Sequence, residues 1–116
     1  MSNKVALFAF NGELMCFGHV LLNALDMKEK GFDVKVIIEG SATKLLDELA
    51  TPEKPFHKLF TKVKKAGLLD CVCQACASKM NSVQSAQLQQ LRLCNEMSGH
   101  PSMARYLAEG YTILIF

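Results

Sequence analysis

Apolar residues along the chain follow two patterns that predict different elements. Continuous apolar runs are typical of strands buried on both faces of a parallel sheet. These runs lie at residues 5–10, 34–38, 68–73 and 111–116. Between them, apolar residues recur three and four positions apart, which predicts helices. The predicted helices lie at residues 14–30, 41–49, 56–66, 75–80, 82–90 and 103–109.

The alternation of strands and helices predicts an α/β fold. Because parallel strands need crossover connections, this order favours a mainly parallel sheet with helices on both faces. Residues 92–94 are either a short strand or the end of a helix, so we expect four to five strands. The chain has 116 residues and is half hydrophobic, which suffices for one core, and we expect a single domain over residues 1–116.

Charge and hydropathy exclude two classes of partner. A net charge of +2 is too small to indicate nucleic acid, and no apolar run approaches the roughly 18 residues of a membrane helix. The segment Met1-Ser2-Asn3-Lys4 leads directly into the first apolar run, so we expect no signal peptide and a cytoplasmic location.

The five cysteines carry the strongest chemical signal. In a reducing compartment they argue against a disulfide framework and favour metal binding, redox or nucleophilic chemistry. Three of them, Cys71, Cys73 and Cys76, form a C-x-C-x-x-C cluster where a predicted strand meets a predicted helix. We therefore expect the chemistry at this junction.

The predicted topology brings several loops to the same place. In open parallel sheets, ligands bind outside the carboxyl ends of the strands. That edge should hold the cysteine junction, the loop 95–100 that contains His100, and two turns. The turns, expected to shape a cleft, are Asn11-Gly12 and Gly40-Ser41.

Cys73 is the predicted nucleophile. It lies where the strand ends, and the backbone N–H groups and dipole of the following helix favour a thiolate with a lowered pKa. Cys76 lies one helical turn further on, within reach as a resolving or second thiol. His100 is the candidate proton donor.

Other interpretations of the same residues stay open. Cys71, Cys73 and Cys76 could present three thiolates to zinc, with His100 or Cys94 as the fourth ligand. If it binds no metal, Cys71 is expected to be a small residue of the core. Cys94 is either a further relay thiol or a core residue.

Two histidines and the remaining cysteine are weaker candidates. Cys16 and His19 lie three positions apart near the start of a helix and could face the cleft, whereas His57 is expected at the surface. No nucleotide-binding, flavin-binding or hydrolase motif occurs, so we expect no cofactor.

At Cys73-Gln74-Ala75-Cys76-Ala77 the sequence resembles the DsrE/DsrF-like family of small sulfur-relay proteins. The resemblance extends to the strand at 5–10, the strand at 34–40 and the closing segment 109–116. It implies a flavodoxin-like three-layer α/β sandwich and a homo-oligomer.

The resemblance also implies a role for the cysteines. By position, Cys73 would accept sulfur as a persulfide from a donor protein and pass it to an acceptor protein, with Cys76 as its partner thiol. The chain departs from single-cysteine relay subunits in having Cys71 and Cys76 as well. The leading hypothesis is thus a cytosolic sulfur carrier of the sulfurtransferase type. The alternatives are a non-catalytic ligand- or zinc-binding module and a dithiol redox protein.

Overall fold

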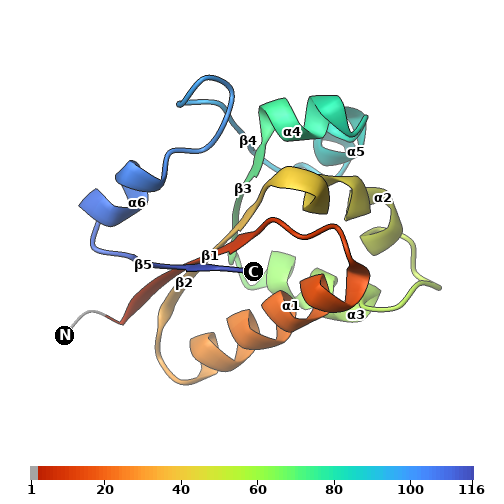
Figure 1. Cartoon of the computed structure of the whole chain (residues 1–116). Helices are drawn as coiled ribbons and strands as arrows, with labels where there is room; N and C mark the ends of the chain where they lie inside the picture. Colours follow the sequence, from red (N-terminus) through yellow and green to blue (C-terminus); the bar gives the residue numbers. More distant parts are fainter. Residues whose placement is uncertain (1–2) are drawn as a thin grey trace.

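A computed structural model describes residues 3–116 and shows a five-stranded sheet (Figure 1). Residues 1–2, which belong to the expected domain, lie outside the described residues. The strands are β1 (Lys4–Ala9), β2 (Asp33–Ile38), β3 (Leu69–Cys73), β4 (Leu93–Cys94) and β5 (Thr112–Ile115). All pairings are parallel, in the order β4-β3-β2-β1-β5. Residues 93–94 are therefore a strand at one edge of the sheet.

The helices agree closely with the hydrophobic spacing. They are α1 (Leu14–Glu29), α2 (Leu46–Leu49), α3 (His57–Lys65), α4 (Gln74–Lys79), α5 (Val83–Leu88) and α6 (Met103–Ala108). A 3-10 helix, η1 (Gly40–Leu45), precedes α2, so the short helix expected at 41–49 is built in two pieces. Across the described residues, none of the helices combines the length and apolar character that a membrane crossing needs.

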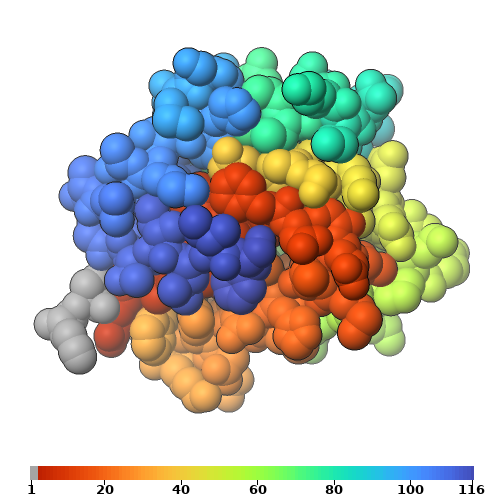
Figure 2. Space-filling model, viewed as in Figure 1, coloured from red at the N-terminus to blue at the C-terminus, as the bar shows by residue number. Residues whose placement is uncertain are grey.

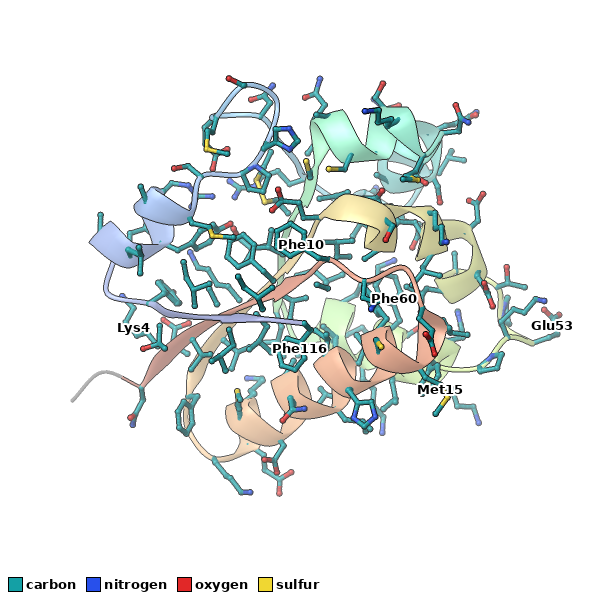
Figure 3. All side chains as sticks on the ribbon, in the orientation of Figure 1. Lys4, Phe10, Met15, Glu53, Phe60 and Phe116 are labelled. Atoms are coloured by element: carbon teal, nitrogen blue, oxygen red, sulfur yellow. A yellow bond between two sulfur atoms is a disulfide. The ribbon has the colours of Figure 1, made fainter. Side chains whose placement is uncertain are left out.

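Side chains alternate between two cores along the strands, because successive residues of a strand point to opposite faces. In β1, Val5, Leu7 and Ala9 enter the larger core, whereas Ala6 and Phe8 enter the smaller one. The larger core lies under α1, α2 and α3; Phe60 points into it, and Met15 points away from the body of the molecule (Figure 3).

The second face of the sheet is covered by α6 (Figure 1). There Tyr106, fully buried, packs edge-on against Phe8 and Tyr111. The chain passes from β4 through α6 to β5, which lies beside β1. The expected α/β sandwich with helices on both faces is confirmed, with one face much more heavily covered than the other.

Candidate active site at the carboxyl edge of the sheet

Cys73 forms the junction between β3 and α4. It is the N-cap residue of α4, with extended backbone angles, and its sulfur accepts a hydrogen bond of 3.4 Å from the Cys76 amide. An N-cap side chain normally satisfies one of the free amides of the first helical turn with an oxygen. In Cys73 the accepting atom is a sulfur, and the hydrogen bond fixes the direction of the Cys73 side chain relative to α4.

The loop after β4 brings His100 to this junction. The Ala75 amide donates to the carbonyl of Gly99 at 2.9 Å, which ties the loop to the first turn of α4. Figure 2 shows the segment after β4, in light blue, against α4, in green. As a result, Nδ1 of His100 lies 3.1 Å from Sγ of Cys73 and 3.8 Å from Sγ of Cys76.

Glu39 completes the cluster and was not predicted from the sequence. It follows β2 directly, and one of its carboxylate oxygens lies 3.6 Å from Nδ1 of His100. The other oxygen, Oε1, is buried without a hydrogen-bond partner. Burial raises the pKa of Glu39, and the nearby His100 opposes that shift. The one available signal was its place at a strand end, immediately before the Gly40 turn.

The electrostatics of Cys73 differ from expectation. Its side chain is 0% exposed, and burial raises the pKa of the thiol to about 12, although the Cys76 amide lowers it. The Cys76 thiol and the Glu39 carboxylate raise the pKa of Cys73 further. The predicted lowering by the helix terminus was wrong, because one amide does not offset the loss of water around a thiolate. Cys73 is a protonated thiol at neutral pH and needs a base to react.

Cys76 differs from Cys73 in access. It is half-buried and lines an open depression of about 360 Å³. The other residues around the depression are Ala75, Ser78, Lys79 and His100. A molecule that enters the depression therefore meets Cys76 and His100, with Cys73 behind them.

Cys71 does not join the other two thiols of the cluster. Its sulfur is bonded to Cys94 across β3 and β4, with a Cα–Cα distance of 5.8 Å. The three-thiolate zinc site with Cys71 is therefore wrong, since a disulfide sulfur is not a thiolate ligand, and Cys94 is not a relay thiol in this state. The expectation of a chain without disulfides fails for the same pair. Cys16, Cys73 and Cys76 are free thiols.

With this geometry established, comparison with known proteins places the chain in a family. Residues 5–116 match the model of the DsrE/DsrF-like family. The chain belongs to the DsrE/DsrF-like family. The expected resemblance is thereby confirmed over nearly the whole chain.

Two archaeal proteins are similar in sequence to this chain. An uncharacterized protein of Methanocaldococcus jannaschii is 41% identical over 96 residues, which is 83% of this chain and 76% of that protein. An uncharacterized protein of Archaeoglobus fulgidus is 44% identical over 43 residues, which is 37% of this chain and 70% of that protein.

A solved structure supports the fold. It is that of a conserved protein of unknown function from Bacteroides thetaiotaomicron, with a TM-score of 0.74 and 16% sequence identity. The match covers 98% of this chain and 95% of that one. The flavodoxin-like α/β fold predicted for this DsrE/DsrF-like chain is thus confirmed.

The two predicted cleft turns of this DsrE/DsrF-like domain contact each other. Ser41 donates to the Phe10 carbonyl at 3.1 Å, and a Cβ at Gly12 would lie 2.9 Å from the Ser41 carbonyl oxygen. The Asn11 side chain accepts from the Glu13 amide at 2.8 Å, just ahead of α1. Neither turn lines the depression beside Cys76, so the expectation that they shape that cleft is not met. Gly40 has a φ of +58°, which lets the chain turn directly after Glu39.

The weaker candidates lie apart from the cysteine cluster. Cys16 and His19 are on α1, where His19 is exposed. Nδ1 of His57 lies 2.8 Å from the Leu49 carbonyl oxygen, so this half-buried ring packs against α2 and is not a free surface residue. Among the described residues, the group formed by Glu39, Cys73, Cys76 and His100 includes none of these three side chains.

Asp70, near the start of β3, ties the strand that ends at Cys73 to neighbouring elements. Its side chain, 15% exposed, lies 3.2 Å from Arg92, 3.7 Å from Arg105 and 3.8 Å from Lys35. The Tyr106 hydroxyl donates to the same carboxylate. Asp70 thus joins β3 to the residue that precedes β4 and to α6, and the His100 loop runs between β4 and α6.

Proposed function

We propose that this DsrE/DsrF-like protein is a sulfur carrier that holds persulfide sulfur on the Cys73–Cys76 pair and passes it to a partner protein. One observation carries the proposal: two free thiols share a single histidine, and one of them faces an open depression. A relay needs this combination, because sulfur must enter from a donor and then be protected from other thiols.

Sulfur enters at Cys76. The Cys76 thiolate attacks the outer sulfur of a donor persulfide, R–S–SH, forming a new S–S bond while the donor S–S bond breaks. The products are Cys76–S–SH and the donor thiolate, which takes up the proton that Cys76 lost. No external oxidant or reductant is needed, since one sulfane sulfur moves between two thiols.

Cys73 holds the sulfur after entry. Its sulfur lies within 4.8 Å of that of Cys76, so it can attack the outer sulfur of the Cys76 persulfide in the same way. His100, 3.1 Å from Sγ of Cys73, accepts the thiol proton of Cys73 and returns it to the released Cys76 sulfur. Glu39 beside His100 stabilises the imidazolium that forms in between.

The donor and acceptor follow from this chemistry, whereas the homo-oligomer is what the family suggests. We propose a donor protein that bears a persulfide, an acceptor protein that removes the sulfur, and assembly of this chain as a homo-oligomer. We propose a cytoplasmic location, where free thiols persist. The Cys71–Cys94 disulfide is compatible with it because both residues are buried and shielded from thiol exchange.

Intact-mass spectrometry tests the proposal. Metal-free protein is incubated with a low-molecular-weight persulfide, and the wild type should gain the mass of sulfur, reversibly with a reductant. The double variant Cys73→Ser/Cys76→Ser should gain none, whereas Cys16→Ser, which removes the third free thiol, should behave as wild type. Equal sulfur gain by the double variant would overturn the proposal.

A dithiol redox protein is the second candidate, favoured by the closeness of the two free thiols. The same experiment separates the two functions. A loss of two hydrogen masses on mild oxidation, with no sulfur gained from any donor, supports the redox protein and excludes the carrier.

A further inference from the structure

The cluster around His100 also has the composition of a metal site. We propose that Glu39, Cys73, Cys76 and His100 together bind one zinc ion. Each residue offers one donor atom, and the four donor atoms all lie within 4.8 Å of one another. They come from the end of β2, the β3–α4 junction and the loop after β4, so the site closes only in the folded chain.

The separations of the donor atoms fit tetrahedral zinc. Zinc binds sulfur at about 2.3 Å and nitrogen or oxygen at about 2.0–2.2 Å, which places neighbouring donors roughly 3.3–3.8 Å apart. Nδ1 of His100 lies 3.1 Å and 3.8 Å from the two sulfurs and 3.6 Å from the Glu39 oxygen. The remaining donor pairs lie within 4.8 Å of one another, so completing the tetrahedron requires movements of up to about 1 Å.

Glu39 supplies an independent reason to expect a ligand. The residue is 7% exposed, yet one of its carboxylate oxygens is buried without any hydrogen-bond partner. An unsatisfied buried carboxylate is costly, and such groups in folded proteins are normally paired or bound to a metal. The oxygen without a partner is Oε1, whereas Oε2 faces His100. A divalent cation among these donors would neutralise the buried carboxylate, and it would also satisfy Oε1 if the carboxylate rotates or binds through both oxygens.

The donor types favour zinc over Mg²⁺ and Ca²⁺. Two thiolates and an imidazole are poor ligands for Mg²⁺ or Ca²⁺, which prefer oxygen, and are typical of zinc. On binding, the two S–H bonds break, two Zn–S bonds form, and the two protons pass to solvent. The four protein ligands leave no open position, which is typical of a closed rather than a catalytic zinc site.

A second group of potential ligands does not compete. Asp70, Cys71 and Cys94 lie within 4.8 Å of one another, but the two sulfurs are bonded to each other. Among the described residues, the free thiolates that could bind zinc alongside a histidine and a carboxylate are those of Cys73 and Cys76.

Zinc at this site would mask the proposed sulfur carrier. Both thiols would be bound to the metal, so the loaded protein should not take up sulfur until the zinc is removed. This consequence rests on the proposed function, whereas the metal site itself does not.

Cobalt titration tests the site with a spectroscopic probe. Thiolate-bound tetrahedral Co²⁺ absorbs strongly in the visible and shows charge-transfer bands in the near ultraviolet. Chelator-treated protein in which Cys73 and Cys76 are free thiols and the Cys71–Cys94 disulfide is intact should bind one equivalent of Co²⁺ with both signatures, and zinc should displace it. Cys16→Ser serves as the matched control and should bind equally.

Ligand variants decide whether the right residues bind. Glu39→Gln, which keeps the shape of the side chain, should weaken cobalt binding at least about tenfold. Cys73→Ser and Cys76→Ser should each remove about half of the charge-transfer intensity. If folded wild-type protein, checked by circular dichroism, binds no cobalt, or if the cysteine variants bind unchanged, the zinc site is excluded.

The two proposals fail separately. Protein that gains sulfur but binds no cobalt overturns the zinc site alone. Protein that binds cobalt but gains no sulfur when metal-free overturns the carrier alone.

Discussion

Nδ1 of His100 lies 3.1 Å from Sγ of Cys73, and this contact joins the loop after the edge strand β4 to the end of the neighbouring strand β3. The contact matters because Cys73 is fully buried and its thiol pKa is raised to about 12. A thiol in that state is a poor nucleophile until a neighbouring base removes its proton. His100 is positioned to be that base.

Replacing His100 should therefore slow transfer to Cys73. His100→Asn keeps a polar side chain but removes the base, and we expect the rate at which sulfur reaches Cys73 to fall roughly 10²-fold. Rapid quenching followed by peptide mass spectrometry measures that rate. His19→Asn, on the exposed face of α1, is the control and should leave it unchanged. A His100→Asn rate equal to wild type would remove His100 from the mechanism.

The two thiols should differ in accessibility. In metal-free native protein, iodoacetamide should modify Cys76, at the depression, at least roughly tenfold faster than the buried Cys73. Peptide mapping of a labelling time course gives both rates. The difference should vanish in denaturant, where both cysteines are exposed. Faster labelling of Cys73 in the native protein would contradict the order of sulfur entry.

We expect that no other residue can replace Gly99 without cost, for two reasons. The chain there lies close to α4, and the backbone has a positive φ. A Cβ there would lie 3.1 Å from that of Ala75, whereas Gly31 has an almost equal φ of +91° with nothing within 4 Å. Gly31→Ala should cost about 1–2 kcal/mol from backbone strain alone. Gly99→Ala should cost about 1 kcal/mol more and slow sulfur transfer by displacing His100.

Chemical denaturation of the two glycine variants measures this difference. Equal losses of unfolding free energy, with sulfur transfer unchanged in Gly99→Ala, would show that the loop tolerates the added methyl group.

Asp70 should stabilise the edge of the sheet. Asp70→Asn removes the negative charge that three cationic side chains share, and we expect the unfolding free energy to fall by about 2–3 kcal/mol. Asp26→Asn, which breaks an exposed pair with Lys30, should change it by less than about 0.5 kcal/mol. Urea unfolding of both variants compares them; similar losses would mean that the Asp70 network adds nothing beyond a surface ion pair.

Glu96 should make stability depend on pH. Its carboxylate accepts from the Ser102 amide at 3.1 Å and pairs with Arg105 at 3.0 Å. Partial burial raises the pKa of Glu96, but the Ser102 amide and the Arg105 guanidinium lower it by more, so the net pKa is below the ordinary value. A lowered folded pKa contributes stability above the unfolded pKa of about 4.3, and that stability is lost as the pH falls through the folded value.

Glu96→Gln removes the charge and keeps the size of the side chain. It should be less stable than wild type by roughly 0.5–1 kcal/mol at neutral pH, and the difference should shrink as the pH falls below about 4. Thermal unfolding over a pH series measures it. A difference that stays constant down to pH about 2 would assign the effect to lost packing rather than to charge.

Much of this fold could be predicted from hydrophobic patterning. Continuous runs such as 34–38 mark buried parallel strands, and those strands place the segment 73–76 at the carboxyl edge. The same topology predicts His100 at this edge, because the loop 95–100 follows the possible strand at 92–94. These features follow from local sequence and one general rule, so no tertiary detail was needed to find them.

The remaining features depend on tertiary contacts. Glu39 is a single acidic residue at a strand end, and its role appears only when the His100 loop folds over it. The bond between Cys71 and Cys94 depends on β4 pairing with β3, and residues 92–94 were ambiguous in sequence. The predicted direction of the Cys73 pKa shift was wrong because burial of the sulfur, which local sequence does not reveal, outweighs the amide of the helix that follows it.

The most direct measurement is a time-resolved map of where the added sulfur resides. Metal-free protein is mixed with a small persulfide, quenched with an alkylating reagent that retains the extra sulfur, and digested for peptide mass spectrometry. Extra sulfur should appear first on Cys76 and then on Cys73, with none on Cys16. Sulfur distributed equally over all three free thiols, or confined to Cys16, would contradict a relay at this junction.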